Sequence, residues 1–373
     1  MRPEAPAARL NDLLVLGGGA AATALVQAAM ARGLSAEALP DPLQTLLGWP
    51  ATYPALPASD VVPWLVTPGF EMECLTAAGP RRHTARALVL ALGVRERLMP
   101  FPGCILPGVG GIGMPIEPGD AVLVVGPLPW REAALARCAA AGAVVSKAPA
   151  IHHVVRVERE AAILRVRLAS ENGDDLVMPA ARLMVADGWL PATDAFRLLQ
   201  AAMQFDLRAE AWLPLHDAAG RCSVPLLYVL DGSPVPLAEA IAADLRRCVW
   251  QTEAMPEPQP GDGTFLSHRI TTLADDTVIC PCEGVTAGSA RALAAGGVRV
   301  VNQLKSASRC GMGECGGRLC EDVVARVLAA ATGQDRAAVG YWTGRAPLVP
   351  VPLRALTGDY DYSDIQLPSA APL

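Results

Sequence analysis

Four cysteines near the C-terminus place the strongest constraint on how this chain can fold. They form two close pairs, Cys280 with Cys282 and Cys315 with Cys320, and 32 residues separate the pairs. Such pairs suit either an iron–sulfur cluster or a structural zinc ion, and both require the chain to bring the pairs together. Zinc knuckles usually place about two to four residues between paired cysteines. Here one and four residues intervene, so the spacing favours a [2Fe–2S] cluster, whose two irons can each take a pair, and zinc is the alternative.

The residues around these cysteines carry a resemblance. The runs Ile279–Thr286 and Arg309–Cys320 resemble the [2Fe–2S] domain of bacterioferritin-associated ferredoxin, as it occurs fused to flavoprotein-like subunits. Residues 287–295 and 321–331 have helical character and can hold the ligand loops on rigid ends. Several glycines let the backbone wrap closely around sulfur: Gly311, Gly313, Gly316 and Gly317.

Cys310 departs from the pattern of that family, which usually has a small apolar residue there. We expect this fifth thiol to be a bystander, with an alternative ligand as the second interpretation.

Composition narrows the class of protein. The chain has 373 residues, enough for two or three domains. Hydrophobic residues make up 52% and charged residues 18%, which favours a protein with large interfaces buried in a complex. We expect no membrane span and no signal peptide, and the ten cysteines then indicate reduced thiols in the cytoplasm. A formal charge of −6 without basic clusters argues against nucleic acid as a partner.

The first domain begins with a nucleotide-binding pattern. An apolar run, residues 13–16, predicts a buried strand, and the turn Gly17-Gly18-Gly19-Ala20-Ala21-Ala22 opens a helix that ends near Arg32. Residues 34–39 predict the next strand. Gly17 would form the tight turn, and Gly19 would let a pyrophosphate approach the helix N-terminus. The expected acidic residue falls near Pro40 and Asp41, so FAD binding and simple close packing both remain open, with Gly17, Gly19 and Ala22 as the candidate contacts.

Two later runs resemble parts of two-dinucleotide flavoproteins. Residues 84–93 resemble a strand that ends in Thr-Gly, with Leu92 in place of the threonine. Residues 223–232 resemble the late strand whose aspartate, here Asp231, contacts the flavin ribityl and pyrophosphate groups. Each run alone also fits an ordinary buried strand that ends in a turn.

A second Rossmann-like half lies between these runs. It is predicted from a strand at 120–126, a helix at 131–141 and a strand at 142–145. Its loop, Gly126-Pro127-Leu128-Pro129-Trp130, keeps one glycine and gains two prolines, which have no N–H for a phosphate. Trp130 also takes space that a nucleotide would need, so we expect no NAD(P) here.

Together these features cover almost the whole chain. With the run from Pro100 to Val109 and the late Pro347–Leu353, they resemble the alpha-type subunits of heteromeric dye-linked dehydrogenases, of the opine oxidase, D-hydroxyproline or proline dehydrogenase and hydrogen cyanide synthase type. The resemblance implies an FAD-bearing catalytic subunit as partner, with a small third subunit as a further candidate, which would make the complex a hetero-oligomer. It also implies that this chain relays electrons.

The fold class expected is α/β, with two partly degenerate Rossmann-like halves and a small helical [2Fe–2S] domain. We predict an FAD-type domain at 1–115 and 220–265, an NAD(P)-type domain at 116–219, the cluster domain at 266–335 and a Pro-rich arm at 336–373. Because prolines at 347, 350, 352, 368 and 372 prevent a long helix, we expect this arm to lie on a partner, and folding back across its own Rossmann core is the alternative.

The sequence contains few candidate catalytic residues, and this narrows the functions that we expect. The five histidines occupy no triad or metal-ligand spacing: His83, His152, His153, His216 and His268. We therefore expect an electron-transfer subunit of a flavin-dependent dehydrogenase that oxidises a C–N bond of an amino acid, opine or related compound, with no catalytic residue of its own. The alternatives are a scaffold with a four-cysteine zinc site and a self-contained NAD(P)H-dependent flavoprotein reductase.

Overall fold

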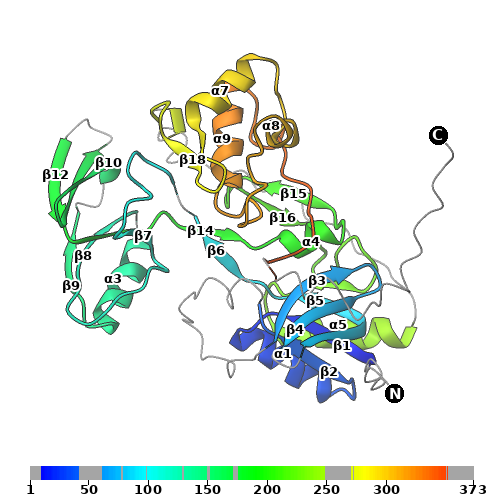
Figure 1. Ribbon diagram of the computed structural model, residues 1–373. Coiled ribbons are helices and arrows are strands. Elements are labelled where there is room, and N and C mark those ends of the chain that lie inside the picture. The colour runs from blue at the N-terminus through cyan, green and yellow to red at the C-terminus, as the bar shows by residue number, and fades with distance from the viewer. Residues whose placement is uncertain are drawn as a thin grey trace, which may run out of the picture.

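The computed structural model describes residues 10–41, 61–76, 79–97, 99–127, 130–148, 152–170, 175–247, 270–271, 273–349 and 351. These form three groups of elements, a sheet-based group at the lower right of Figure 1, a second on the left and a helical group at the top. Several predicted features lie outside the described residues, among them Leu128, Pro129, His268, Pro350 and everything after Val351.

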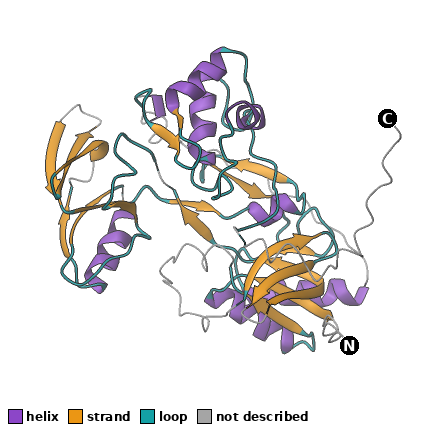
Figure 2. Cartoon of the chain, viewed as in Figure 1, coloured by secondary structure: helices purple, strands orange, loops and turns teal. Residues whose placement is uncertain are grey.

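The first group is built on a parallel sheet that continues into an antiparallel meander, as the strand colouring of Figure 2 shows. Its strand order is β2-β1-β5-β4-β3, and β17 pairs with β5. The long strand β5 serves both parts, because its first half pairs with β4 and its second half runs parallel to β1 and β17. The elements are β1 (Leu10–Leu16), α1 (Ala20–Met30), β2 (Ala36–Leu39), β3 (Val62–Thr67), β4 (Glu71–Thr76), β5 (Gly79–Leu90), β17 (Leu227–Val229) and α5 (Pro234–Arg247).

Both faces of the parallel strands are buried, which explains their continuous apolar sequence. Leu13 and Val15 face the helices α1 and α5, whereas Leu14 and Leu16 face the meander. The predicted strand at 13–16 and the helix after the glycine turn are therefore confirmed as β1 and α1.

The second group repeats the same three-layer plan. Its parallel sheet has the order β7-β13-β8-β9, with α3 on one face and a separate antiparallel sheet, β10-β11-β12, on the other. The elements are β7 (Val109–Gly111), β8 (Ala121–Val125), α3 (Trp130–Ala140), β9 (Val144–Lys147), β10 (His152–Glu160), β11 (Ile163–Ser170), β12 (Asp175–Ala180) and β13 (Arg182–Val185). The strand–helix–strand predicted from residue 120 onward is confirmed.

Short elements connect the groups. β6 (Val94–Glu96) and β14 (Trp189–Pro191) form an antiparallel ribbon through which the chain enters and leaves the second group. After it come α4 (Asp194–Leu198) and the hairpin β15 (Met203–Asp206) with β16 (Ala211–Pro214).

The helical group contains the cysteines. Its described elements include a small hairpin, β18 (Val278–Cys280) with β19 (Val285–Thr286), and the helices α7 (Ala287–Ala295), α8 (Val301–Ser308) and α9 (Glu321–Thr332). Thr286 begins α7 as a capping box with Ser289. The helices predicted at 287–295 and 321–331 are confirmed.

The segment after α9 corrects one expectation. We expected the arm from Tyr341 onward to lie on a partner, but its described part packs on its own chain. Trp342 is buried in the helical group, and Leu348 is buried against the first sheet, where its N–H donates to the Trp64 carbonyl at 2.7 Å. Apolar side chains this close to their own core are buried there and are not free to meet another protein.

The predicted fold class is confirmed: an α/β chain with two Rossmann-like halves and a small helical group. The exact domain boundaries stay a prediction. Among the described helices, none is long and apolar enough to cross a membrane.

Candidate metal centre

The five C-terminal cysteines come from three segments that meet at the start of α9. Cys280 ends β18 and Cys282 follows in the hairpin turn, while Cys310 lies two residues after α8. Cys315 lies in the loop between α8 and α9, and Cys320 is the residue directly before α9.

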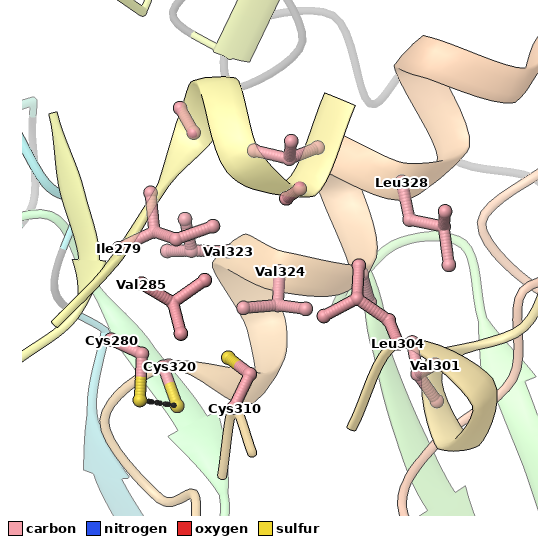
Figure 3. Packing of buried hydrophobic residues seen from close by; sticks show 14 of the residues in the cluster. Ile279, Cys280, Val285, Val301, Leu304, Cys310, Cys320, Val323, Val324 and Leu328 are labelled. Atoms are coloured by element: carbon pink, nitrogen blue, oxygen red, sulfur yellow. Dashed lines mark hydrogen bonds between the residues drawn. The ribbon is translucent and has the colours of Figure 1, made fainter. Parts of the chain in front are cut away.

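Three of these thiols form a buried group. The sulfurs of Cys280, Cys310 and Cys320 all lie within 4.8 Å of one another, and none of the three residues is exposed. The Sγ atoms of Cys320 and Cys280 lie 3.5 Å apart. Figure 3 shows the three side chains together at the edge of the apolar core, near Val285 and Val324.

The other two cysteines face outward. Cys282 is exposed and Cys315 is partly exposed. The Cys282 sulfur contacts both the backbone N–H and the thiol of Cys315. The structure therefore pairs Cys280 with Cys320 and Cys282 with Cys315, across the two sequence motifs. The hairpin turn points its two cysteines to different depths, and our interpretation that each sequence motif can hold one iron of a cluster stays a prediction.

The surroundings of Cys280 favour its thiolate. Hydrogen bonds from the Cys310 and Cys320 thiols, and from the backbone N–H groups of Gly311 and Glu283, lower the pKa of Cys280 to about 2. The same Cys280 partner raises the pKa of Cys310 and Cys320. A thiolate is the form that binds metal, so Cys280 is the ionised thiol of the buried group, whereas Cys310 and Cys320 would have to lose their protons to bind a metal.

Glycines in the loop are required by close contacts. A Cβ on Gly313 would lie 2.3 Å from the Cys282 Cβ, and one on Gly317 would lie 2.2 Å from the Trp342 ring. Trp342 also donates from its Nε1 to the Val301 carbonyl at 3.3 Å. The Trp342 ring thus packs against the backbone of the ligand loop. The sequence analysis missed this role, because it placed the arm that contains Trp342 on a partner.

A buried ionic junction joins the start of α9 to the rest of the chain. Arg95 on β6 lies 3.4 Å from Glu321 and 3.2 Å from Asp194, and Arg197 on α4 also pairs with Glu321. Next to it, Asp322 is 3.0 Å from Arg326, 3.4 Å from Arg97 and 3.6 Å from Arg336. Although burial opposes it, these arginines lower the pKa of Asp322. Both acids also suit a helix N-terminus, whose partial charge is positive.

The first predicted nucleotide site keeps its geometry. Gly17 adopts φ +151°, and a Cβ there would lie 2.2 Å from the Ala91 carbonyl oxygen, so the turn needs glycine. Gly19, by contrast, has nothing within 4 Å of its Cβ position, and α1 has no side-chain cap. Ala22 lies on the buried face of α1. Asp231 follows β17 at the same edge of the sheet; its side chain is largely exposed and lies 3.6 Å from that of His216. The open turn and uncapped helix leave room for a phosphate group.

The second Rossmann turn is filled. Trp130 begins α3, and its Nε1 lies 3.0 Å from the Cβ position of Gly188. Its ring also meets Trp189 edge-on, with ring centroids 6.2 Å apart. Both tryptophans therefore lie at the carboxyl edge of this sheet, where a nucleotide would bind in a Rossmann fold.

The comparisons with known proteins agree with this arrangement. The Sarcosine oxidase A3 domain family matches residues 277–359, the segment that contains all five clustered cysteines. The A subunit of the opine oxidase of Rhizobium meliloti (strain 1021) is 26% identical over 368 residues, which cover 78% of this chain and 80% of that one. The chain is therefore similar to the opine oxidase A subunits over most of its length. Hydrogen cyanide synthase subunit HcnB of Pseudomonas protegens is 25% identical over 349 residues, covering 72% of this chain and 74% of that one.

The fold of this chain also occurs in a solved structure. The L-proline dehydrogenase from P. horikoshii superimposes with a TM-score of 0.66 over 92% of this chain and 78% of that chain, at 16% identity. The predicted resemblance to the alpha-type subunits of heteromeric dehydrogenases is thus confirmed.

The sequence already showed Cys310 as a fifth thiol, and a further pattern supports its place in the group. Cys310, Cys315 and Cys320 are spaced five residues apart, so a regular series of three thiols was visible. The spacing could not reveal which of these thiols are buried. In the structure, Cys310 and Cys320 are buried beside Cys280, whereas Cys315 is partly exposed.

Proposed function

We propose that this chain is the electron-transfer subunit of a multi-subunit, flavin-dependent dehydrogenase. The complex oxidises a C–N bond of an amino acid, an opine or a related compound. Cys280, Cys282, Cys315 and Cys320 hold a [2Fe–2S] cluster, and substrate oxidation takes place on a partner subunit.

One observation carries the proposal: four thiols at the start of α9 are arranged as an inner and an outer pair. The inner pair, Cys280 and Cys320, has its sulfurs 3.5 Å apart. Two thiolates on one tetrahedral metal, each with a bond of about 2.3 Å, lie about 3.8 Å apart, so the inner pair fits a single metal ion with little movement. The outer pair, Cys282 and Cys315, offers the same chemistry to a second ion.

The burial of the inner cysteine pair and the exposure of the outer pair also suit electron transfer. A [2Fe–2S] cluster bound there would accept and release single electrons. The inner thiols fix one end in apolar surroundings, and Cys282 exposes the other end. Met312 and Leu319 are exposed next to this end, at 44% and 39%, and give a partner an apolar surface to approach. A cavity of about 720 Å³ opens beside the ligand loop, lined among others by Gly311, Gly313 and Trp342.

A flavin belongs to the same proposal. FAD would place its pyrophosphate at Gly17 and Gly19, over the start of α1, with Asp231 at the same sheet edge. The open space at Gly19 supports this assignment. The packing of Trp130 against Gly188 supports the absence of NAD(P) from the second half.

The test is made on the complex purified without air from its native source. We expect iron and acid-labile sulfide in equal amounts, a rhombic EPR signal after reduction with dithionite, and the same signal after addition of the correct amino acid or opine. Replacing Cys315 or Cys320 with Ser in this chain should remove the iron, because a hydroxyl is a poor ligand for iron held by thiolates.

Two outcomes would replace the proposal. Stoichiometric zinc without sulfide would identify the four-cysteine group as a structural zinc site and the chain as a scaffold. Steady consumption of NADH or NADPH by the chain alone would identify a self-contained reductase.

A further inference from the structure

The cysteines near α9 contain a second set of ligands that overlaps the first. Cys310 has no place in the four-cysteine set, yet its sulfur lies within 4.8 Å of those of both Cys280 and Cys320. All three residues are fully buried and come from different segments, the end of β18, the segment after α8 and the residue before α9. Convergence of three thiols from three segments makes a metal-binding group in its own right.

The chemistry of this trio differs from that of the four-cysteine set. Three sulfurs around one point suit one soft metal ion, and thiolate ligands select zinc among the common divalent ions. In a tetrahedral zinc site sulfurs lie about 3.8 Å apart, close to the 3.5 Å between Cys280 and Cys320. Three protein ligands leave a fourth position for water, and Gly311, the neighbour of Cys310, lines the adjacent cavity through which an ion can enter.

We propose that Cys280, Cys310 and Cys320 form a mononuclear Zn²⁺ site that competes with the cluster. Both sets need Cys280 and Cys320, so a chain can hold zinc or the cluster but not both. The zinc site itself stands on the trio alone, whereas the competition rests on the proposed function. Binding releases a proton from each thiol that is protonated beforehand and involves no change of oxidation state.

Two single substitutions separate the two sets, Cys310→Ala and Cys282→Ala. The full chain is freed of metal without air, and Zn²⁺ alone is added in competition with a chromophoric chelator. Co²⁺ serves in parallel as the optical probe for thiolate coordination. We expect one Zn²⁺ per wild-type chain and an unchanged affinity in Cys282→Ala. In Cys310→Ala the affinity should fall by more than about 100-fold, beyond the loss typical of residues outside the ligand shell.

The same two variants are then given iron and sulfide. The Cys310→Ala chain should still assemble a cluster, which also shows that it folds, and the Cys282→Ala chain should not. If Cys310→Ala fails to fold, Cys310→Ser takes its place. Finally, Zn²⁺ added before iron should block cluster assembly in the wild type but not in Cys310→Ala.

The failures of the two proposals look different. Loss of zinc in Cys282→Ala but not in Cys310→Ala, or in neither variant, would overturn the trio site. Loss of iron uptake in a folded Cys310 variant, with iron retained in Cys282→Ala, would overturn the proposed cluster ligands whatever zinc does.

Discussion

Gly17 and Gly19 lie in one turn after β1, but their surroundings differ. Gly17 has a positive φ, and a Cβ at this position would clash with the Ala91 backbone. A Cβ at Gly19, by contrast, would meet nothing within 4 Å. The first glycine is therefore needed by the fold itself. The second is needed only if something else, such as a pyrophosphate, occupies the space in front of it.

This difference gives a matched pair of variants. Gly19→Val should abolish flavin binding, because the new side chain would fill the phosphate position, and should lower the melting temperature of the flavin-free chain less than Gly17→Ala does. Gly17→Ala should lower the free energy of unfolding by about 1–3 kcal/mol through its clash with the Ala91 carbonyl. Thermal melts, together with flavin released by acid and separated by chromatography, check both. Flavin retained at full occupancy in Gly19→Val would place it elsewhere.

Glu96 is a second residue whose surroundings can be tested, through the pH dependence of protein stability. Its carboxylate accepts hydrogen bonds from the backbone N–H groups of Ile112 and Gly113, the latter at 3.2 Å. Burial, reinforced by nearby Asp187, nevertheless raises the pKa of Glu96 to about 7. In the unfolded chain a glutamate titrates near its usual value of about 4.3.

The sign of the resulting pH effect follows from this shift. The folded state binds the proton more tightly, so the stability contributed by neutral Glu96 is complete below about pH 4 and is lost as pH rises toward about 7, by up to about 3 kcal/mol. Glu96→Gln is neutral throughout and should remove this part of the decline. Urea unfolding of both proteins at about pH 5 and about pH 8 measures the difference. Parallel pH profiles for the two chains would contradict the shift.

At the scale of elements, helix α9 depends on charges buried at its first turn. Glu321 has two arginine partners, Arg95 and Arg197, which come from β6 and α4. Glu321 also accepts the Trp342 backbone N–H at 3.0 Å. The Glu321 carboxylate thus connects the helical group to the ribbon, to α4 and to Trp342, which packs against the ligand loop.

Removing that charge should be costly. We expect Glu321→Gln to lower the free energy of unfolding by about 3 kcal/mol or more, because it removes from buried Arg197 and Arg95 an anion that balances their charge, and leaves Arg95 with Asp194. The control is Glu283→Gln, whose partner Arg309 lies 3.1 Å away but is 70% exposed, and it should cost less than about 1 kcal/mol. Urea unfolding of the metal-free chain compares the two, and equal effects would show that the junction does not carry this stability.

The local sequence predicted elements well where one pattern decided them. The apolar run of β1, the helix after Gly19 and the capped helix α7 all follow from near neighbours in the chain. Burial depth was harder, because Cys310 and Trp342 are placed by segments distant in sequence. Their contacts with Cys280 and Gly317 arise only when the helical group closes, which no local pattern contains.

At the scale of the whole molecule, the segment after α9 connects two groups. Trp342 lies in the helical core, and six residues later Leu348 enters the core of the first sheet. The same stretch of chain therefore fixes the position of the metal centre relative to the first Rossmann half. The prolines that led us to expect an arm on a partner are compatible with this extended path.

A leucine pair tests the connection. Leu348→Ala should lower the free energy of unfolding by about 2–5 kcal/mol, as for other buried leucines, since Leu348 is only 3% exposed. Leu319→Ala, at 39% exposure, should have little effect on the isolated chain. Chemical unfolding gives both values. A Leu348→Ala chain as stable as the wild type would mean that this segment is not held on its own core.

The ribbon of β6 and β14 has an evolutionary consequence. Trp189 lies opposite Glu96, so the chain departs for the second group and returns from it through neighbouring strands, about 5 Å apart. A gene that lost the stretch between them could close the gap with a short turn and leave the order β2-β1-β5 intact. Arg97 and Met99, at the start of that stretch, contact the helical group, whereas the second sheet and α3 have an apolar core of their own. A binding site there can decay, its turn filled by a ring such as Trp130, while selection continues to preserve the remainder.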